Sequence, residues 1–190
     1  MGNKLKITNA ELDGVRIIEP IVHEDSRGVF ARVFCANELK EIFKDNVIKQ
    51  VNHSFTHKKG AVRGLHFQYY PDCEIKLIKC IKGSILDFVV DIRKDSPTFL
   101  KSYSVELSEN NKKMIYIPEG FAHGFQTLED DIELLYFHSK TYSPDNEGAL
   151  NVKDPLLNIK LPLDIIDISK RDSEHKYLNS NFQGIKIDEL

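Results

Sequence analysis

The chain has 190 residues, of which 41% are hydrophobic and 29% are charged. That length suits one domain with a single core, and this composition excludes disorder as the main state. No apolar run is long enough to span a membrane, and a net charge of -3 gives no general attraction for nucleic acid. Three cysteines without a C-x-x-C pair, and no apolar signal segment at the N-terminus, lead us to expect a cytoplasmic protein.

The first third of the chain is predicted to hold two strands and a helix. β-branched residues predict a strand over residues 12–19, and a polar loop over residues 24–28 separates it from a second strand over residues 29–34. A helix is predicted over residues 37–46, because apolar side chains recur there on one helical face. So short a helix is marginal alone, which implies that it packs against a sheet.

Later segments follow the pattern of β-strands. Two apolar runs, residues 76–81 and 84–92, are separated by Lys82 and Gly83, which predicts a hairpin. Further strands are predicted over three ranges, residues 102–108, 114–117 and 132–137. Many short strands with few helices favour a sandwich, jelly roll or barrel. We expect one domain over residues 1–190, with a C-terminal segment from about residue 161 that wraps the body or forms a small helix.

Two short strings contain the candidate chemistry. R-G-L-H-F-Q, at residues 63–68, contains His66, and I-P-E-G-F-A-H-G-F, at residues 117–125, contains His123. The second string resembles the second motif of cupins, which are double-stranded β-helix jelly rolls. Metal-binding cupins supply an H-x-H pair in the first motif, whereas here Gln68 follows His66 at that spacing, so we expect no catalytic metal. Taken singly, either histidine could be a hydrogen-bonded structural residue.

The order of several segments resembles the dTDP-4-dehydrorhamnose 3,5-epimerase family, cupin-fold enzymes of deoxysugar biosynthesis. Besides the two strings, the matching segments are residues 25–28, 50–54, 76–77, 90–99, 107–110 and 142–144. The matches extend from about residue 10 to residue 172 and therefore cover most of the chain. The resemblance implies a mainly β fold, a cupin-type double-stranded β-helix (jelly roll) with one or two short helices.

The resemblance also implies a reaction, epimerisation of a nucleotide-diphosphate-linked 4-keto-6-deoxy sugar at C3, C5 or both. The ketone at C4 acidifies the neighbouring C–H bonds, so inversion needs a base on one face and an acid on the other. By the family pattern, His66 is the base and Asp172 is its carboxylate partner. Tyr136 is the acid, and Lys76 is the cation near the C4 oxygen. The implied reaction needs no metal or organic cofactor.

Other positions are implied to bind the nucleotide or the sugar. Arginine suits a diphosphate because its planar guanidinium donates two parallel hydrogen bonds. The implied substrate-binding residues are Arg27, Phe30, Arg32, Gln50, Asn52, Arg63, His123, Tyr142 and Glu147. Members of the family are dimers that share N-terminal strands, so we expect a homodimer in which some of these residues reach the partner's site. We expect no nucleic-acid or membrane partner.

Arg32 departs from the family pattern in a way that concerns the nucleotide. The family usually has a glutamate there, which resembles an acceptor for the N3–H of thymine. Arginine has only donors, and these would suit the N3 and O2 acceptors of cytosine instead. The sequence therefore leaves both a dTDP-linked and a CDP-linked sugar open.

Three alternative functions also stay open. A metal-dependent cupin, such as a dioxygenase or an isomerase, would need His66, His123 and Glu74 to converge on one ion. A non-catalytic cupin would bind a sugar nucleotide without exchanging hydrogen at C3 or C5. Keto migration in a 4-keto sugar, which related cupins catalyse, would use the same enolisation.

Overall fold

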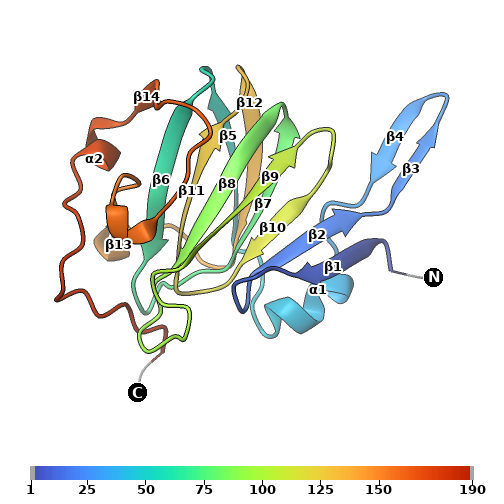
Figure 1. Cartoon of the computed structure of the whole chain (residues 1–190). Coiled ribbons are helices and arrows are strands. Elements are labelled where there is room, and N and C mark those ends of the chain that lie inside the picture. The colour runs from blue at the N-terminus through green and yellow to red at the C-terminus, as the bar shows by residue number, and fades with distance from the viewer. Residues whose placement is uncertain (1–2, 189–190) are drawn as a thin grey trace.

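A computed structural model describes residues 3–188 and places two β-sheets face to face (Figure 1). The first sheet has the strand order β1 (Leu5–Asn9), β2 (Arg16–Pro20), β10 (Met114–Ile117), β7 (Lys76–Lys82), β12 (Ile132–His138) and β5 (Gln50–Thr56). The second has the order β13 (Glu147–Ala149), β6 (Ala61–Gln68), β11 (Phe121–Thr127), β8 (Ser84–Asp91) and β9 (Ser102–Ser108), with β14 (Asp167–Ile168) parallel to β6. The mainly β prediction is confirmed.

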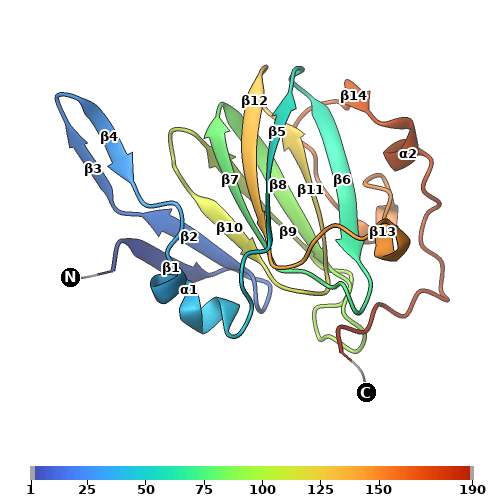
Figure 2. The same cartoon turned by 180° about the vertical axis from the view of Figure 1, so that it is seen from behind.

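Apolar side chains of the two sheets meet in one core. Ile78 and Ile115 extend into it from the first sheet, Val89 and Phe125 from the second, and all four are at most 1% exposed. A second apolar cluster covers the outer face of β6, β8 and β11. The chain after β13 lies along that face, as both views show, and residues such as Phe182 pack into the cluster (Figures 1 and 2).

Three short helical segments follow strand β12. They are the 3-10 helices η1 (Pro144–Asn146) and η2 (Pro155–Leu157), and the one-turn helix α2 (Lys170–Ser173). Within residues 3–188, no helix has the length and apolar character needed to cross a bilayer.

The helix predicted over residues 37–46 is confirmed as α1 (Ala36–Phe43). It buries Leu39 and Phe43 against the first sheet, which is the packing that so short a helix needs. Glu38 accepts hydrogen bonds from the backbone N–H groups of Lys4 and Leu5, so the helix also holds the start of β1.

One local prediction was wrong and another was incomplete. β7 and β8 do not pair with each other: β7 pairs with β10 and β12, whereas β8 pairs with β9 and β11. Gly83, with φ +73°, lies where the chain crosses from one sheet to the other. A turn residue between two apolar strands is also the sequence pattern of a hairpin. The polar loop predicted over residues 24–28 contains the turn of a hairpin between β3 (Val22–Asp25) and β4 (Gly28–Ala31), of which β3 was not predicted.

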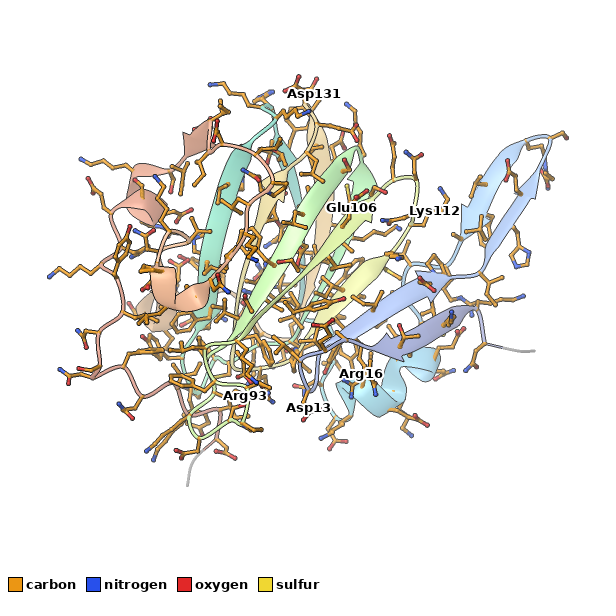
Figure 3. The ribbon with its side chains drawn as sticks, viewed as in Figure 1. Asp13, Arg16, Arg93, Glu106, Lys112 and Asp131 are labelled. Atoms are coloured by element: carbon orange, nitrogen blue, oxygen red, sulfur yellow. The ribbon has the colours of Figure 1, made fainter. Side chains whose placement is uncertain are left out.

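Arg93 joins the N-terminal segment to the second sheet. Its guanidinium lies 2.7 Å from Asp91 Oδ2, and it donates to the carbonyl of Asp13 at 3.1 Å (Figure 3). The same group stacks over the ring of Phe121, with 4.7 Å between the guanidinium carbon and the ring centroid. These contacts fix one end of the molecule, opposite the strand ends near Asp131 (Figure 3).

Candidate active site

A cavity of about 810 Å³ opens between the two sheets. Strands β5, β6, β7, β11 and β12 supply most of its wall, and the segments around Tyr142 and residues 167–172 supply the rest. Because strand side chains alternate between faces, residues two apart on a strand, such as His123 and Phe125 on β11 or Tyr136 and His138 on β12, line the cavity together. The cavity therefore collects polar side chains that are far apart in the sequence.

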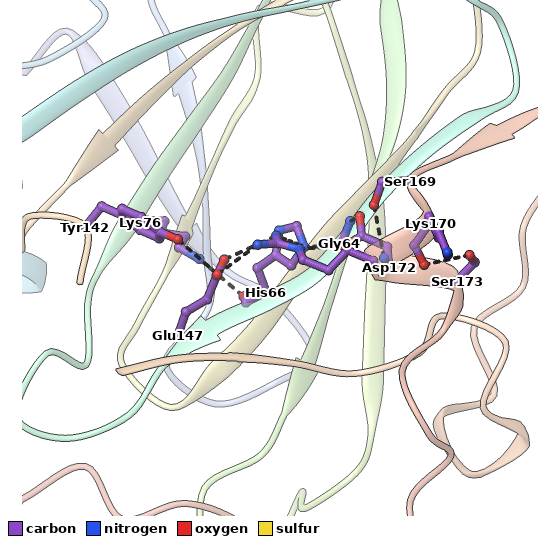
Figure 4. A network of polar contacts seen from close by, with 10 residues as sticks. Gly64, His66, Lys76, Tyr142, Glu147, Ser169, Lys170, Asp172 and Ser173 are labelled. Atoms are coloured by element: carbon purple, nitrogen blue, oxygen red, sulfur yellow. Dashed lines mark hydrogen bonds and ion pairs between the residues drawn. The ribbon is translucent and has the colours of Figure 1, made fainter. Parts of the chain in front are cut away.

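His66 and Asp172 form a close pair in this wall. His66 Nε2 lies 2.8 Å from Asp172 Oδ1, and the Gly64 N–H donates to the other carboxylate oxygen at 3.3 Å (Figure 4). Asp172 lies on α2, where its own N–H donates to the side chain of the N-cap residue Ser169. Burial raises the pKa of Asp172, but the hydrogen bond and charge of His66 outweigh it and hold the pKa at about 2. Asp172 is therefore an anion that can stabilise an imidazolium.

Two glycines allow β6 and β11 to approach closely beside His66. Gly64 has φ +112°, and a Cβ at this position would lie 2.6 Å from both the Cα of Gly124 and the carbonyl oxygen of His123. The ladder between the two strands also shifts register between His123 and Phe125. Gly64, the glycine of the R-G-L-H-F-Q string, is therefore needed for the close approach of β6 and β11. That approach places His66 opposite His123.

Tyr136 reaches the same cavity from the opposite sheet. It lies on β12 and is half-buried, and its ring centroid is 6.2 Å from that of His123. His123 Nε2 in turn lies 2.7 Å from Oδ2 of the buried Asp87. Burial raises the pKa of Tyr136 well above its ordinary value, so the phenol keeps its proton at neutral pH. The structure thus brings His66 and Tyr136 together across one cavity.

Lys76 is 7% exposed and lies in the cavity wall on β7, whereas most lysines are solvated. Its Nζ lies 3.2 Å from Glu74 Oε1 and donates to the backbone carbonyl of His66, also at 3.2 Å. Glu74 Oε2 lies 2.7 Å from His138 Nδ1. A buried ammonium with fixed partners is therefore available in the wall that also holds His66.

The predicted substrate-binding residues divide into two groups. The residues that line the cavity are Asn52, Arg63, His123, Tyr142 and Glu147. Gln50 lies at its rim, where its side chain bonds Asn52 and the Tyr142 backbone. Arg27, Phe30 and Arg32 lie outside the cavity lining of their own chain.

Each of those three outlying residues has its own surroundings. Arg27 pairs with Asp25 at 2.6 Å at the tip of the β3–β4 hairpin. Phe30 is 74% exposed on the same hairpin. Arg32 follows the hairpin and is paired with Glu38 of α1.

Among the cavity residues that were not predicted, Arg171 and His138 contact predicted ones. Arg171 Nη1 lies 2.9 Å from Glu147 Oε2, and its Nη2 lies 3.1 Å from His66 Nε2. Tyr142 donates to the same Glu147 oxygen at 3.0 Å (Figure 4). His138 lies two residues after Tyr136 on β12, and the two rings are nearly parallel at 6.0 Å. The spacing from Tyr136 was the available signal for His138, since alternate strand residues share a face.

The three residues that a metal-dependent cupin would need, His66, His123 and Glu74, line the same cavity but are not placed to hold one ion. His66 and His123 each pair with a carboxylate of their own, and Glu74 is held by Lys76 and His138. Over residues 3–188, no group of three or more His, Cys, Asp or Glu side chains is placed to hold one ion.

Comparisons with known proteins agree with this geometry. The family model described as dTDP-4-dehydrorhamnose 3,5-epimerase matches residues 9–180. A relative of that name from Shigella flexneri is 38% identical over 180 residues, covering 94% of this chain and 99% of the relative. A crystal structure of a dTDP-6-deoxy-D-glucose-3,5-epimerase from Legionella pneumophila, in complex with dTDP-4-keto-L-rhamnose, superposes with a TM-score of 0.89 at 33% identity, over 98% of this chain and 100% of that one.

A further comparison concerns the number of centres inverted. A 3'-monoepimerase from Streptomyces bikiniensis, crystallised with dTDP-quinovose, superposes with a TM-score of 0.83 at 34% identity, over 88% of this chain and 85% of that one. The cupin fold and the isomerase class expected from the sequence are confirmed, and the metal-dependent alternative is not supported. The chain belongs to the dTDP-4-dehydrorhamnose 3,5-epimerase family.

Proposed function

We propose that this protein epimerises a dTDP-linked 4-keto-6-deoxyhexose at C3, C5 or both. The observation that carries the proposal is the position of His66 and Tyr136, which face one cavity from opposite sheets. An imidazole on one side and a phenol on the other are what inversion next to a ketone requires, because the proton must leave one face and arrive on the other.

In the proposed mechanism His66 removes the proton next to the C4 ketone. The electron pair of the broken C–H bond moves toward C4 and gives an enolate whose charge lies on the C4 oxygen. Lys76 donates a hydrogen bond to that oxygen, and the anionic Asp172 stabilises the imidazolium of His66. Tyr136 then returns a proton to carbon from the opposite face. Tyr136 is protonated at neutral pH and therefore has a proton to donate at this step.

The nucleotide is proposed to be dTDP. Both nucleotide-sugar ligands named in the solved relatives are dTDP-linked. The pairing of Arg32 with Glu38 weakens the argument for cytosine, because that guanidinium already has a partner in its own chain. Competitive binding of dTDP and CDP tests this point: dTDP should displace a fluorescent nucleotide at lower concentration, and a preference for CDP would overturn it.

A homodimer is proposed to complete the site. The β3–β4 hairpin projects from the body in both views (Figures 1 and 2), and it exposes Val29 and Phe30 by 50% and 74%. Two strands alone are marginal in water, and exposed apolar residues on such an arm favour an interface. We propose that the hairpin crosses to a second copy and brings Arg27 and Phe30 to that copy's cavity. We also propose a cytoplasmic location, in keeping with free thiols at Cys35, Cys73 and Cys80.

The proposed reaction is tested in heavy water with dTDP-4-keto-6-deoxyglucose. Deuterium should enter at C3, C5 or both with inversion, and the position of the label tells how many centres are inverted. A His66→Asn variant should lose turnover by about 10²–10⁴-fold. Binding without exchange would support the non-catalytic alternative, and a product with its carbonyl at C3 would support keto migration; either result would overturn the proposal.

A further inference from the structure

The ammonium group of Lys76 has two protein acceptors. Glu74 Oε1 and the carbonyl oxygen of His66 each lie 3.2 Å from Nζ. Among the described residues, no other acceptor lies within hydrogen-bond distance of this nitrogen. An ammonium has three N–H donors, so one remains for a ligand. The two protein acceptors therefore decide where the third N–H points.

Glu74 uses both of its carboxylate oxygens inside the cavity wall. While Oε1 faces Lys76, Oε2 accepts from His138 Nδ1 at 2.7 Å, and all three side chains are nine-tenths buried or close to it. Lys76 and His138 are direct cross-strand neighbours on β7 and β12. The carboxylate thus bridges two adjacent strands and is held at both ends.

A directed chain of hydrogen bonds fixes the ring of His138. The Tyr142 N–H donates to Gln50 Oε1 at 3.0 Å, and Gln50 Nε2 donates to Asn52 Oδ1 at 3.2 Å. Asn52 Nδ2 then lies 3.4 Å from His138 Nε2. Since an amide nitrogen only donates, this order requires Nε2 of His138 to accept and its proton to be on Nδ1, facing Glu74.

We propose that Glu74 and His138 are positioning residues that aim the free N–H of Lys76 at the C4 oxygen of the substrate. The inference rests on the proposed function, because it needs Lys76 to meet the enolate oxygen. A lysine side chain is long and flexible, so an unheld ammonium would lose orientation and with it part of its stabilisation of the developing charge. His138 acts one step further away, by keeping the Glu74 carboxylate turned toward Lys76.

Glu74→Gln is the sharpest single change. Glutamine has nearly the same size, but its amide offers one acceptor oxygen where two donors, Lys76 and His138, must be satisfied. We expect kcat to fall by about 10–100-fold, less than the loss from removing the Lys76 donor itself, while KM changes little. A His138→Phe variant keeps an aromatic ring beside Tyr136 and should show a smaller loss of kcat.

A double-mutant cycle with Lys76→Met separates positioning from a general effect. If Glu74 acts through Lys76, Glu74→Gln should lower kcat little further once the lysine is gone. The same fold-loss with and without Lys76 would overturn the inference. His57→Gln is the matched control, because this exposed histidine lies 3.6 Å from Asp131 and outside the cavity lining, and it should leave kcat and KM unchanged.

Nitrogen-15 NMR of the histidine rings tests the pair without a substrate. In the wild type, His138 should carry its proton on Nδ1. Glu74→Gln should weaken the hydrogen bond at Nδ1 and shift the Nδ1 resonance, while the Asn52 contact keeps the tautomer and a thermal unfolding scan shows the protein still folded. A proton on Nε2 in the wild type would overturn the inference. If the protein turns over no nucleotide sugar, the proposed function is wrong. The NMR measurement would still show whether Glu74 accepts a hydrogen bond from His138.

Discussion

At the scale of single residues, Asp172 contributes to both the site and the stability of the fold. Its pKa is about 2 in the folded protein, against an ordinary value of 3.8. Because the folded-state pKa is lowered, the stabilisation is present above the unfolded pKa and is lost as the pH falls toward 2. We expect the free energy of unfolding to decrease from about pH 5 downward, and less steeply in Asp172→Asn. Urea denaturation at a series of pH values measures this, and parallel curves for the two proteins would contradict it.

Tyr136→Phe separates proton removal from inversion. The variant keeps the ring between His123 and His138 but removes the hydroxyl that is proposed to donate from the second face. His66 should still form the enolate and can return a proton only to the face it came from. We therefore expect deuterium to enter the substrate from heavy water with little inversion, as read by NMR and mass spectrometry. Loss of exchange together with inversion would instead mean that Tyr136 is needed to form the enolate.

The sequence was sufficient to identify the residues that we propose as reactive, but not their neighbours. His66, Tyr136, Asp172 and Lys76 match the family pattern at their own positions, and the structure gathers all four at one cavity. The spacing from Tyr136 places His138 on the cavity face of its strand, but the contact of His138 with Glu74 and that of Arg171 with Glu147 depend on the assembled structure. Which residue lies beside another across a sheet depends on register, and register is a property of the assembled strands.

At the scale of elements, the contact between β6 and β11 depends on Gly64. A methyl group there would meet backbone atoms at 2.6 Å, and backbone cannot move aside as a side chain can. We expect Gly64→Ala to destabilise the fold by a few kcal/mol and to reduce activity by displacing His66. Gly28→Ala is the control for stability, because Gly28 also has a positive φ but nothing within 4 Å. Equal melting temperatures for the two variants would show that the close contact is unimportant.

The path of the chain between elements was the harder part to predict. Strands such as Met114–Ile117 and Ile132–His138 are apparent from their apolar pattern. The crossing at Gly83 was not, because a turn between two apolar strands is the same signal whether they pair or separate into facing sheets. The turn of the β3–β4 hairpin lies inside the predicted polar loop and β4 overlaps the strand predicted over residues 29–34, but β3 was not predicted, because its four residues are mostly polar.

At the scale of the whole molecule, the proposed dimer should depend on the apolar arm. Phe30→Ser removes the most exposed large apolar side chain of the β3–β4 hairpin without touching the core. We expect the variant to dissociate at protein concentrations where the wild type remains dimeric, as measured by sedimentation equilibrium. Thermal unfolding of the monomeric fraction should show that the body of the protein is intact. A wild type that is monomeric at all concentrations would remove the shared-site proposal.

Mixing two inactive variants tests whether the arm serves the partner's cavity or its own. Arg27→Ala should impair the arm and His66→Ala the base, so each homodimer should have two defective sites. If the arms cross, each cavity combines His66 of one chain with Arg27 of the other. In a mixed dimer, one cavity then has both residues intact and the other cavity has both changes. Random pairing should then restore about a quarter of the wild-type activity per subunit. If each arm served its own chain, every site in the mixture would retain one defect, and mixing would restore nothing.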